Sequence, residues 1–301
     1  MKYSFKYFEK CNMCETDIKY SYVLGKRMNR SQGIRPKKKI GISTTIMKCS
    51  NCELIFPNPL PVPENIDQHY GVPPEDYWTK EFLELSDNYF KPHADTFKRL
   101  YGNKEDMTAL DIGAGTGLCV ISLKKNGFEA YGLEPSEPFY ERAITQMGIS
   151  KDRMKLSTVE DAEYDNEKFD FITFGAVLEH LYSPSLAIKK SLQWLKPNGL
   201  IHIEVPSSKW LTNKIYNLVY RVQGLDYVGN ISPMHTPFHL YEFGLKSFEL
   251  HSQRYNYKIA QHKFMVCETF LPKILNPIIK PIMDKTNTGM ELEVWLRKTE
   301  N

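Results

Sequence analysis

The pattern of apolar and polar positions divides the chain into a mixed N-terminal part and a C-terminal part in which strand-like and helix-like segments alternate. Short apolar runs predict strands, and apolar residues three or four positions apart predict helices. The expected strands are 107–112, 129–133, 169–174, 200–205, 257–263 and 291–297, and the expected helices are 116–126, 137–147 and 184–195. This alternation predicts a doubly wound α/β domain, with a parallel sheet covered by helices on both faces.

The same pattern indicates three regions. Residues 1–62 hold two cysteine pairs and are expected to form a small metal-binding module. Residues 63–106 form a connector or lid, which opens with closely spaced prolines and continues with helical spacing from Trp78 to Leu100. Residues 107–301 form the α/β domain, with a less regular insertion at about 207–245. Prolines 272, 277 and 281 are expected to break up the segment before the final strand.

Composition favours an ordinary globular protein. Of 301 residues, 42% are hydrophobic, which is enough for a full core. Lys and Arg number 39 against 36 Asp and Glu, so the net charge of +3 gives no overall attraction to nucleic acid or to an anionic membrane. The longest uncharged apolar stretch, 112–123, is shorter than the roughly 20 residues that a bilayer crossing needs. With no secretory signal visible at the N-terminus, a cytoplasmic location is expected.

The most informative motif is Asp111-Ile-Gly-Ala-Gly-Thr-Gly117, placed where a predicted strand gives way to a helix. Its glycines allow a sharp turn and a close approach to a ligand, and the helix that follows offers unpaired N–H groups. The next predicted strand ends at Glu134, 21 residues after Gly113. An ionised carboxylate there suits the two hydroxyls of a ribose. The motif predicts a cofactor that contains a nucleoside.

Two other interpretations of this motif are less favoured. A nicotinamide dinucleotide site has the same spacing, but its pattern has a third glycine at position 118, which is Leu118 here. In addition, Asp111 would repel a pyrophosphate, whereas it suits a cationic amino-acid group. The other alternative is a tight turn that binds no ligand.

The glycine motif and Glu134, together with Phe169-Asp-Phe-Ile-Thr-Phe-Gly-Ala-Val-Leu-Glu-His-Leu and Leu195-Lys-Pro-Asn-Gly199, resemble class I S-adenosylmethionine-dependent methyltransferases. The resemblance covers about 107–205 and implies a Rossmann-like sheet of seven strands with the last strand antiparallel. It implies that S-adenosylmethionine is the cofactor. The residues it assigns to the cofactor are Asp111, Gly113, Ala114, Gly115 and Gly117 at the methionine part, Glu134 and Pro135 at the ribose, Val159 with Glu160 or Asp161 at the adenine, and Gly175, Ala176 and Val177 on the active-site side.

His180 follows the strand that ends near the reacting centre. It is a candidate general base for an acceptor hydroxyl, with Glu179 as a neighbouring acceptor. The alternative is a histidine at a helix start that only binds a loop carbonyl. Glu179-His180-Leu181 also resembles a motif of small-molecule O- and C-methyltransferases, which bears on its position and not on its role.

Two further groups of residues are candidates for ligand contacts. His235, His239 and Tyr241 are expected to line the substrate site. Metal binding by the two histidines is disfavoured, because Pro237 between them makes a regular helix unfavourable. Tyr77, in the expected lid, is a candidate contact for the cofactor carboxylate, and aromatic packing is its alternative role.

Four cysteines form two Cys-x-x-Cys pairs, Cys11 with Cys14 and Cys49 with Cys52. In a reducing compartment such pairs predict a Cys₄ site for structural Zn²⁺. The spacer of 34 residues is long, and the basic segment from Lys26 to Lys39 is expected to loop out of it. Glu15 and Glu53 occupy the position where such turns often have glycine. The module resembles those that precede sugar-modifying methyltransferases of bacterial polysaccharide and deoxysugar pathways.

The sequence therefore favours an S-adenosylmethionine-dependent methyltransferase for a small-molecule acceptor, with a sugar or nucleotide-sugar as the expected substrate. One alternative is a zinc-ribbon RNA methyltransferase that grips phosphates through the segment Lys26–Lys39, although nucleic acid is not the expected partner. Another is a non-catalytic zinc-binding scaffold. The oligomeric state and the methylated atom stay open.

Overall fold

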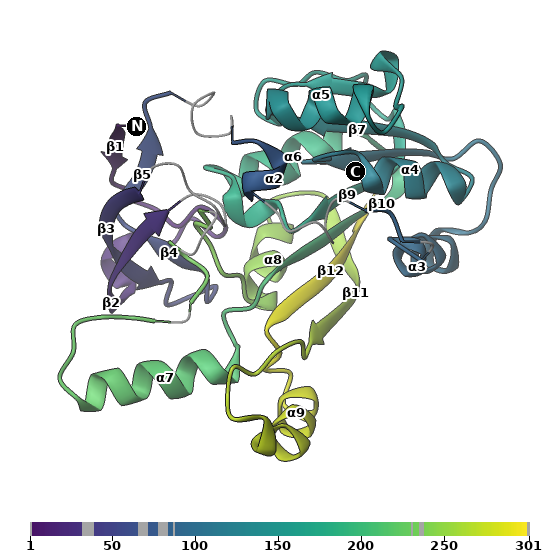
Figure 1. The fold of residues 1–301 in the computed structure, drawn as a ribbon. Helices are drawn as coiled ribbons and strands as arrows, with labels where there is room; N and C mark the ends of the chain where they lie inside the picture. Colours follow the sequence, from purple (N-terminus) through teal and green to yellow (C-terminus); the bar gives the residue numbers. More distant parts are fainter. Residues whose placement is uncertain are drawn as a thin grey trace.

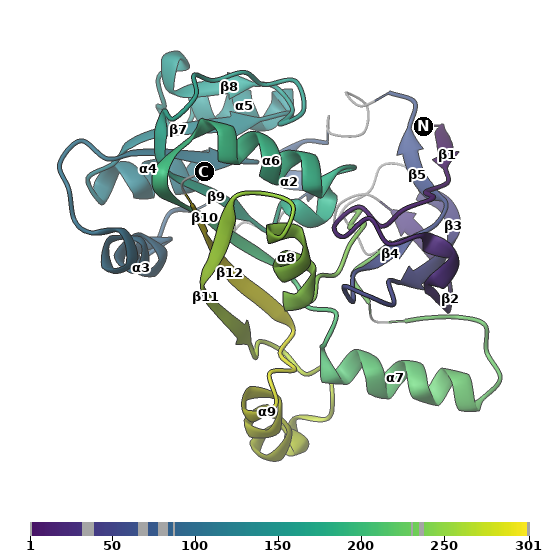
Figure 2. The same cartoon turned by 180° about the vertical axis from the view of Figure 1, so that it is seen from behind.

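The computed structural model describes residues 2–31, 39–65, 72–77, 84–86, 88–229, 231–234 and 238–299, with the backbone alone at 29–31, 39, 40 and 77. An α/β domain forms the larger part, and the N-terminal strands lie to one side of it, above α7 (Figure 1). The reverse view shows the same arrangement (Figure 2). Within the described ranges, every helix falls short of the length and apolar character that a membrane crossing requires.

The central sheet has seven strands in the order β11-β12-β10-β9-β6-β7-β8. β12 runs antiparallel to β10 and β11, and the other neighbouring pairs are parallel. The strands are β6 (Thr108–Ile112), β7 (Glu129–Glu134), β8 (Met154–Leu156), β9 (Phe169–Gly175), β10 (Leu195–Pro206), β11 (Tyr257–Met265) and β12 (Glu291–Lys298). The predicted Rossmann-like fold with an antiparallel last strand is confirmed.

Alternating side chains of these strands enter two separate apolar clusters. Ala109, Phe171 and Trp295 join a cluster with side chains of α3, α4 and α5. Leu110 and Ile172, one position later in their strands, join a second cluster with side chains of α6 and α8. Since successive strand residues point to opposite faces, the helices cover both faces of the sheet. The helices are α2 (Pro74–Tyr77), α3 (Lys91–Tyr101), α4 (Leu118–Lys125), α5 (Glu137–Thr145), α6 (Pro184–Trp194), α7 (Leu211–Val222), α8 (Leu245–Ser252) and α9 (Asn276–Lys285).

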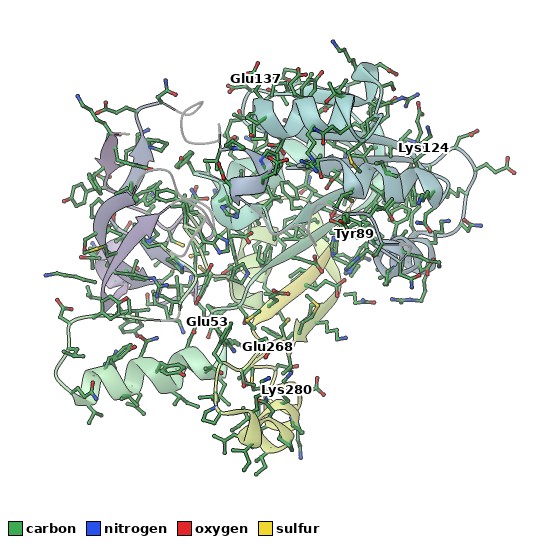
Figure 3. All side chains as sticks on the ribbon, viewed as in Figure 1. Glu53, Tyr89, Lys124, Glu137, Glu268 and Lys280 are labelled. Carbon is green, nitrogen blue, oxygen red and sulfur yellow. The ribbon has the colours of Figure 1, made fainter. Side chains whose placement is uncertain are left out.

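The N-terminal part consists of two small antiparallel sheets. β1 (Tyr3–Lys6) pairs with β5 (Leu60–Pro63), while β2 (Tyr22–Ser31), β3 (Lys39–Lys48) and β4 (Ile55–Pro57) form the other sheet. The apolar side chains of this part belong to the same cluster as α8. Glu53, labelled in Figure 3, lies where the two parts meet, with its carboxylate 3.7 Å from Lys209 Nζ. The N-terminal part is thus packed against the α/β domain.

Several expectations about individual elements were wrong. The basic segment Lys26–Lys39 is no simple loop, because β2 and β3 extend into it from both ends and pair as a hairpin, while 32–38 lie outside the described residues. The helix expected from Trp78 does not include 84–86 or 88–90 and begins at Lys91, where Pro92 occupies the first turn and favours a helix start, while 78–83 and 87 lie outside the described residues. The prolines after Pro272 do not exclude a helix: α9 takes Pro277 in its first turn and includes Pro281. The insertion contains a regular helix, α7.

Candidate functional site

The turn after β6 takes a conformation that depends on glycine. Gly113, Gly115 and Gly117 have φ angles of +72°, +55° and +83°, which L side chains rarely adopt. A Cβ atom at Gly113 would also lie 2.5 Å from Cγ2 of Val177, which comes two residues after the end of β9. The backbone of the turn therefore lies close to Val177 at the exit of β9. Helix α4 begins immediately after the turn, at Leu118.

Glu134 lies beside this turn at the end of β7. Its carboxylate accepts hydrogen bonds from the backbone N–H of Gly115 at 2.7 Å and of Ser136 at 2.8 Å. Burial raises the pKa of Glu134 to about 7, against the opposing effect of these two hydrogen bonds. An ionised carboxylate has about four acceptor positions, so two remain for a ligand. The structure thus brings together the glycine turn and the acid that the sequence singled out.

Asp111, the last-but-one residue of β6, is a second buried carboxyl in this place. Burial raises the pKa of Asp111 to about 8, and the charge of Glu134 adds to the shift, while a hydrogen bond with Cys119 opposes it. Two carboxyl groups in one buried region favour a ligand that brings positive charge. A cationic amino-acid group meets that requirement, and a pyrophosphate does not.

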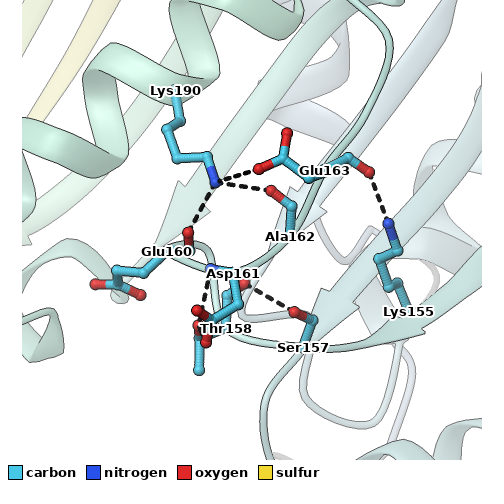
Figure 4. A network of polar contacts seen from close by, with 8 residues as sticks. All are labelled: Lys155, Ser157, Thr158, Glu160, Asp161, Ala162, Glu163 and Lys190. Atoms are coloured by element: carbon cyan, nitrogen blue, oxygen red, sulfur yellow. Dashed lines mark hydrogen bonds and ion pairs between the residues drawn. The ribbon is translucent and has the colours of Figure 1, made fainter.

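The segment after β8 follows directly on from Glu134. The N–H of Ser157 donates to the Glu134 carbonyl at 3.1 Å. Figure 4 shows how α6 holds the segment: Lys190 Nζ donates to the carbonyls of Glu160 and Ala162, both at 2.8 Å. Val159 is buried, and the Glu160 carboxylate points away from Lys190 (Figure 4). Val159 and Glu160 therefore lie on a segment that two neighbouring elements fix in place. Sequence reasoning missed Lys190, which has no motif around it.

The exit of β9 forms the other side of the site. Gly175 and Ala176 are exposed, and Ala176 has a φ of +54°. The Ala176 N–H donates to the carbonyl of Glu204 at the end of β10, at 3.2 Å. Sequence reasoning also missed Glu204, although its place at the carboxyl end of a central strand is where the ligands of such sheets gather.

A short 3₁₀ helix, Leu178–His180, places Glu179 and His180 next to His239. Burial raises the pKa of Glu179 to about 8, and its Oε2 has no hydrogen-bond partner among the described residues. Burial lowers the pKa of His180 to about 4, partly offset by its hydrogen bond to the backbone of Phe238. The His180 and His239 rings meet edge to face with centroids 4.5 Å apart. These three side chains form a compact polar group beyond the β9 exit.

Three other residues were predicted from sequence to contact the substrate or the cofactor: Tyr241, His235 and Tyr77. Tyr241 is fully buried, and its hydroxyl donates to the Tyr182 carbonyl at 3.2 Å, so it serves as a packing residue here. His235 lies outside the described residues. Tyr77 ends α2, and its side chain is likewise outside the described part of the chain.

The four paired cysteines come together in the N-terminal part. Cys11 Sγ lies 3.5 Å from Cys52 Sγ, Cys14 Sγ lies 3.6 Å from Cys49 Sγ, and all four sulfurs fall within 4.8 Å of one another. Four thiolates around one Zn²⁺ at about 2.3 Å have sulfur–sulfur separations of about 3.8 Å. The donor set and its spacing therefore fit a tetrahedral zinc ion.

The two cysteine turns repeat one geometry. In each, the N–H of the first cysteine donates to the carbonyl five residues on: Cys11 donates to Thr16 O at 2.9 Å, and Cys49 to Leu54 O at 2.8 Å. Glu15 and Glu53 have φ angles of +58° and +65°, so both stand at the position where glycine is common. The second turn is also anchored to α8, because Ser247 Oγ donates to the Cys52 carbonyl at 2.8 Å.

Comparison with known proteins decides the family. A family described as "Methyltransferase domain" matches residues 84–262, more than half of the chain. The chain belongs to this methyltransferase-domain family. Among curated proteins, it is 32% identical over 144 residues to a ubiquinone biosynthesis O-methyltransferase of Bartonella bacilliformis, covering 47% of this chain and 55% of that protein.

Two other comparisons agree with this family. The chain is 30% identical over 132 residues to a ubiquinone biosynthesis O-methyltransferase of Coxiella burnetii, covering 42% of this chain and 53% of that protein. It therefore matches about half the length of these relatives. A solved SAM-dependent methyltransferase from Methanosarcina mazei shares the fold, with a TM-score of 0.50 and 17% identity over 70% of this chain and 98% of that one.

Proposed function

We propose that this methyltransferase-domain protein transfers the methyl group of S-adenosylmethionine to a small-molecule acceptor. The observation that carries the proposal is the buried Glu134 carboxylate, which Gly115 N–H holds at 2.7 Å across the glycine turn. When bound, the cofactor supplies an electrophilic methyl group on a sulfonium. Asp111 and the turn would hold its methionine part, Glu134 and Pro135 its ribose, and Val159 and Glu160 its adenine.

Replacement of Glu134 tests the cofactor assignment. Glu134→Ala removes the acceptor for the ribose hydroxyls, so we expect the dissociation constant for S-adenosylmethionine to rise at least about tenfold, or about 1.4 kcal/mol. Isothermal titration calorimetry measures it. Glu137→Ala is the matched control, since Glu137 is exposed on α5 nearby. Unchanged affinity in a folded Glu134→Ala protein would refute the ribose assignment.

We assign the proton transfer to His180. Its pKa of about 4 leaves the imidazole neutral at neutral pH, so a ring nitrogen can accept the proton of an acceptor hydroxyl. His180→Ala is expected to lower turnover while the cofactor dissociation constant stays the same. His262→Ala, an exposed histidine on β11, is the control. Wild-type turnover in the His180 variant would remove this residue from the mechanism.

For the acceptor, we propose a sugar or nucleotide-linked sugar. The acidic and imidazole groups of Glu179, His180 and His239 offer the hydrogen bonds that a polyhydroxylated molecule needs, and the four-cysteine module resembles those of sugar-modifying enzymes. The named relatives are ubiquinone biosynthesis O-methyltransferases, so phenols are the second class of acceptor to test beside sugars. Formation of S-adenosylhomocysteine with each acceptor class separates the two, and activity on phenols alone would contradict the sugar assignment.

The alternative of RNA methylation has less support. Of the cations offered for phosphate binding, Arg27 is buried and donates to the Val228 carbonyl at 3.5 Å, and Lys26 Nζ lies 3.5 Å from the Asp226 carboxylate. RNA binding that weakens steeply with salt would favour this alternative.

A chain that binds no S-adenosylmethionine at all would favour a non-catalytic scaffold. The proposed thiolate ligands need a reducing compartment, which agrees with a cytoplasmic location.

A further inference from the structure

A second group of metal-ligand side chains lies between α3 and the sheet, apart from the cysteines. His93 comes from α3, His202 and Glu204 from β10, and Glu293 from β12. Glu204 Oε1 lies 3.1 Å from His93 Nε2 and 4.0 Å from His202 Nε2, and Glu293 Oε1 lies 3.6 Å from His202 Nε2. The donor atoms of His93, His202 and Glu204 all lie within 4.8 Å of one another, and Glu293 approaches this group on the side of His202.

Like His93, His202 has a ring nitrogen that the hydrogen bonds of the described residues leave unsatisfied. Its side chain is fully buried, and its Nε2 has no hydrogen-bond partner within the described part of the chain. The two nearest carboxylate oxygens, of Glu204 and Glu293, are too distant for a hydrogen bond at 4.0 Å and 3.6 Å. A buried imidazole nitrogen without a partner is costly, and a cation between it and the carboxylates removes that cost.

The outer contacts of these side chains hold them in a ligand orientation. Thr173 Oγ1 lies 2.8 Å from His202 Nδ1, the nitrogen that faces away from the cluster. Trp295 Nε1 donates to Glu293 Oε1 at 2.7 Å. Metal-binding histidines and carboxylates have such outer partners, which fix the ring and direct the lone pair inward.

We propose that His93, His202 and Glu204 bind one divalent transition-metal ion, with zinc as the best fit. Tetrahedral nitrogen and oxygen ligands at about 2.0–2.1 Å lie about 3.3 Å from one another, within the range of the separations here. Two imidazoles favour zinc over magnesium or calcium. The side chains of His93 and Glu204 are 24% and 25% exposed, which gives the ion a path inward. The ion would fasten α3 to β10.

Cobalt substitution distinguishes this site from the cysteine site. Co²⁺ bound by thiolates gives strong charge-transfer absorption, which an ion bound by nitrogen and oxygen lacks. We expect wild-type protein loaded with Co²⁺ to hold two ions per chain. Cys49→Ser should lose the thiolate absorption and keep one ion, and His93→Gln should keep the thiolate absorption and hold one ion fewer than wild type.

Controls make the outcome decisive. His262→Gln, an exposed histidine on β11, should bind as many ions as wild type. Glu204→Gln has the same shape as the native residue and should also lose one ion, which keeps the test valid if His93→Gln weakens α3. The proposal is overturned if His93→Gln and Glu204→Gln bind as many ions as wild type. Cofactor affinity does not enter this measurement, so its result is separate from that of the Glu134 test.

Discussion

At the residue scale, Gly113 connects the cofactor turn to the exit of β9. Val177 occupies the space that a Cβ atom at position 113 would need, with Cγ2 at 2.5 Å and Cγ1 at 3.0 Å. Valine is branched at Cβ and has few alternative rotamers, so rotation about χ1 does not move both Cγ atoms out of this space. A side chain at 113 must therefore displace Val177, which lines the active-site side of the proposed cofactor pocket.

We expect Gly113→Ala to lower both the free energy of unfolding and the affinity for S-adenosylmethionine. Gly127→Ala separates the two causes, because Gly127 has a similar φ of +88° but nothing within 4 Å of an added Cβ. The control should show only the backbone cost, of about 1–2 kcal/mol. Overpacking should add about 1–3 kcal/mol at position 113. Urea denaturation and calorimetry measure both variants, and equal losses would contradict the contact with Val177.

At the element scale, Lys190 is the link between α6 and the segment proposed to bind adenine. Its Nζ donates to two carbonyls at 2.8 Å and lies 3.2 Å from the Glu163 carboxylate. Its side chain is 13% exposed, so these hydrogen bonds are protected from water. A charged donor shared by two carbonyls restricts the segment before any ligand arrives, which lowers the ordering cost of binding.

Lys190→Met keeps most of the side-chain volume and removes the donor. We expect a cofactor dissociation constant about three- to tenfold higher and faster hydrogen exchange of the amides at 158–163. Lys189→Met is the matched control, since Lys189 is the exposed neighbour on the same helix. If Lys190→Met binds the cofactor as wild type does, the segment does not depend on α6 for its conformation.

The central sheet was predictable from sequence because its strands are strongly apolar and its turns carry glycine. β6, β7 and β9 begin and end within about one residue of their predicted bounds. β8 was missed because it has only three residues, Met154–Leu156, two of them exposed. α7 was missed because it leaves Leu218 and Val222 exposed, and α9 because its two prolines resemble breaks in the chain.

The candidate site was predictable where one short motif carries it. Asp111, the glycines and Glu134 come together because a strand, a turn and the next parallel strand fix their separation. Lys190, Glu204 and Glu293 approach their partners only through tertiary packing, so no local pattern marks them. His202 lies within a strand, and its unpartnered nitrogen becomes evident only in the folded chain.

At the scale of the whole molecule, four carboxyl groups that are buried in the described part of the chain have pKa values raised to about 7 or 8. These values are about 8 for Asp111, about 7 for Glu134, about 8 for Glu179 and about 7 for Glu242. The folded protein therefore binds protons more tightly than the unfolded chain, where such groups titrate near 4. Their stabilising contribution is complete below the unfolded pKa and is lost as pH rises through 7 to 8.

We expect the free energy of unfolding to fall between pH 6 and pH 9. Glu293 does not oppose this trend, because its pKa of about 2 gives stability that is lost only on acidification below about 4. Urea denaturation at several pH values measures the slope. Glu242→Gln should reduce it, because one of the four groups no longer titrates. A stability that is constant from pH 6 to pH 9 would contradict the raised pKa values.

Cofactor binding should then be linked to proton release. The ammonium and sulfonium groups of S-adenosylmethionine favour the ionised form of Asp111, so binding at pH 7 must expel the proton that the buried carboxyl holds. Affinity should rise from pH 6 to pH 8, and calorimetry in two buffers of different ionisation enthalpy should count the released protons. Asp111→Asn should abolish most of the release. Glu242→Gln should leave it unchanged, since Glu242 contacts Ser232 and Asn213 instead. Proton uptake on binding would contradict the charge assignment of the pocket.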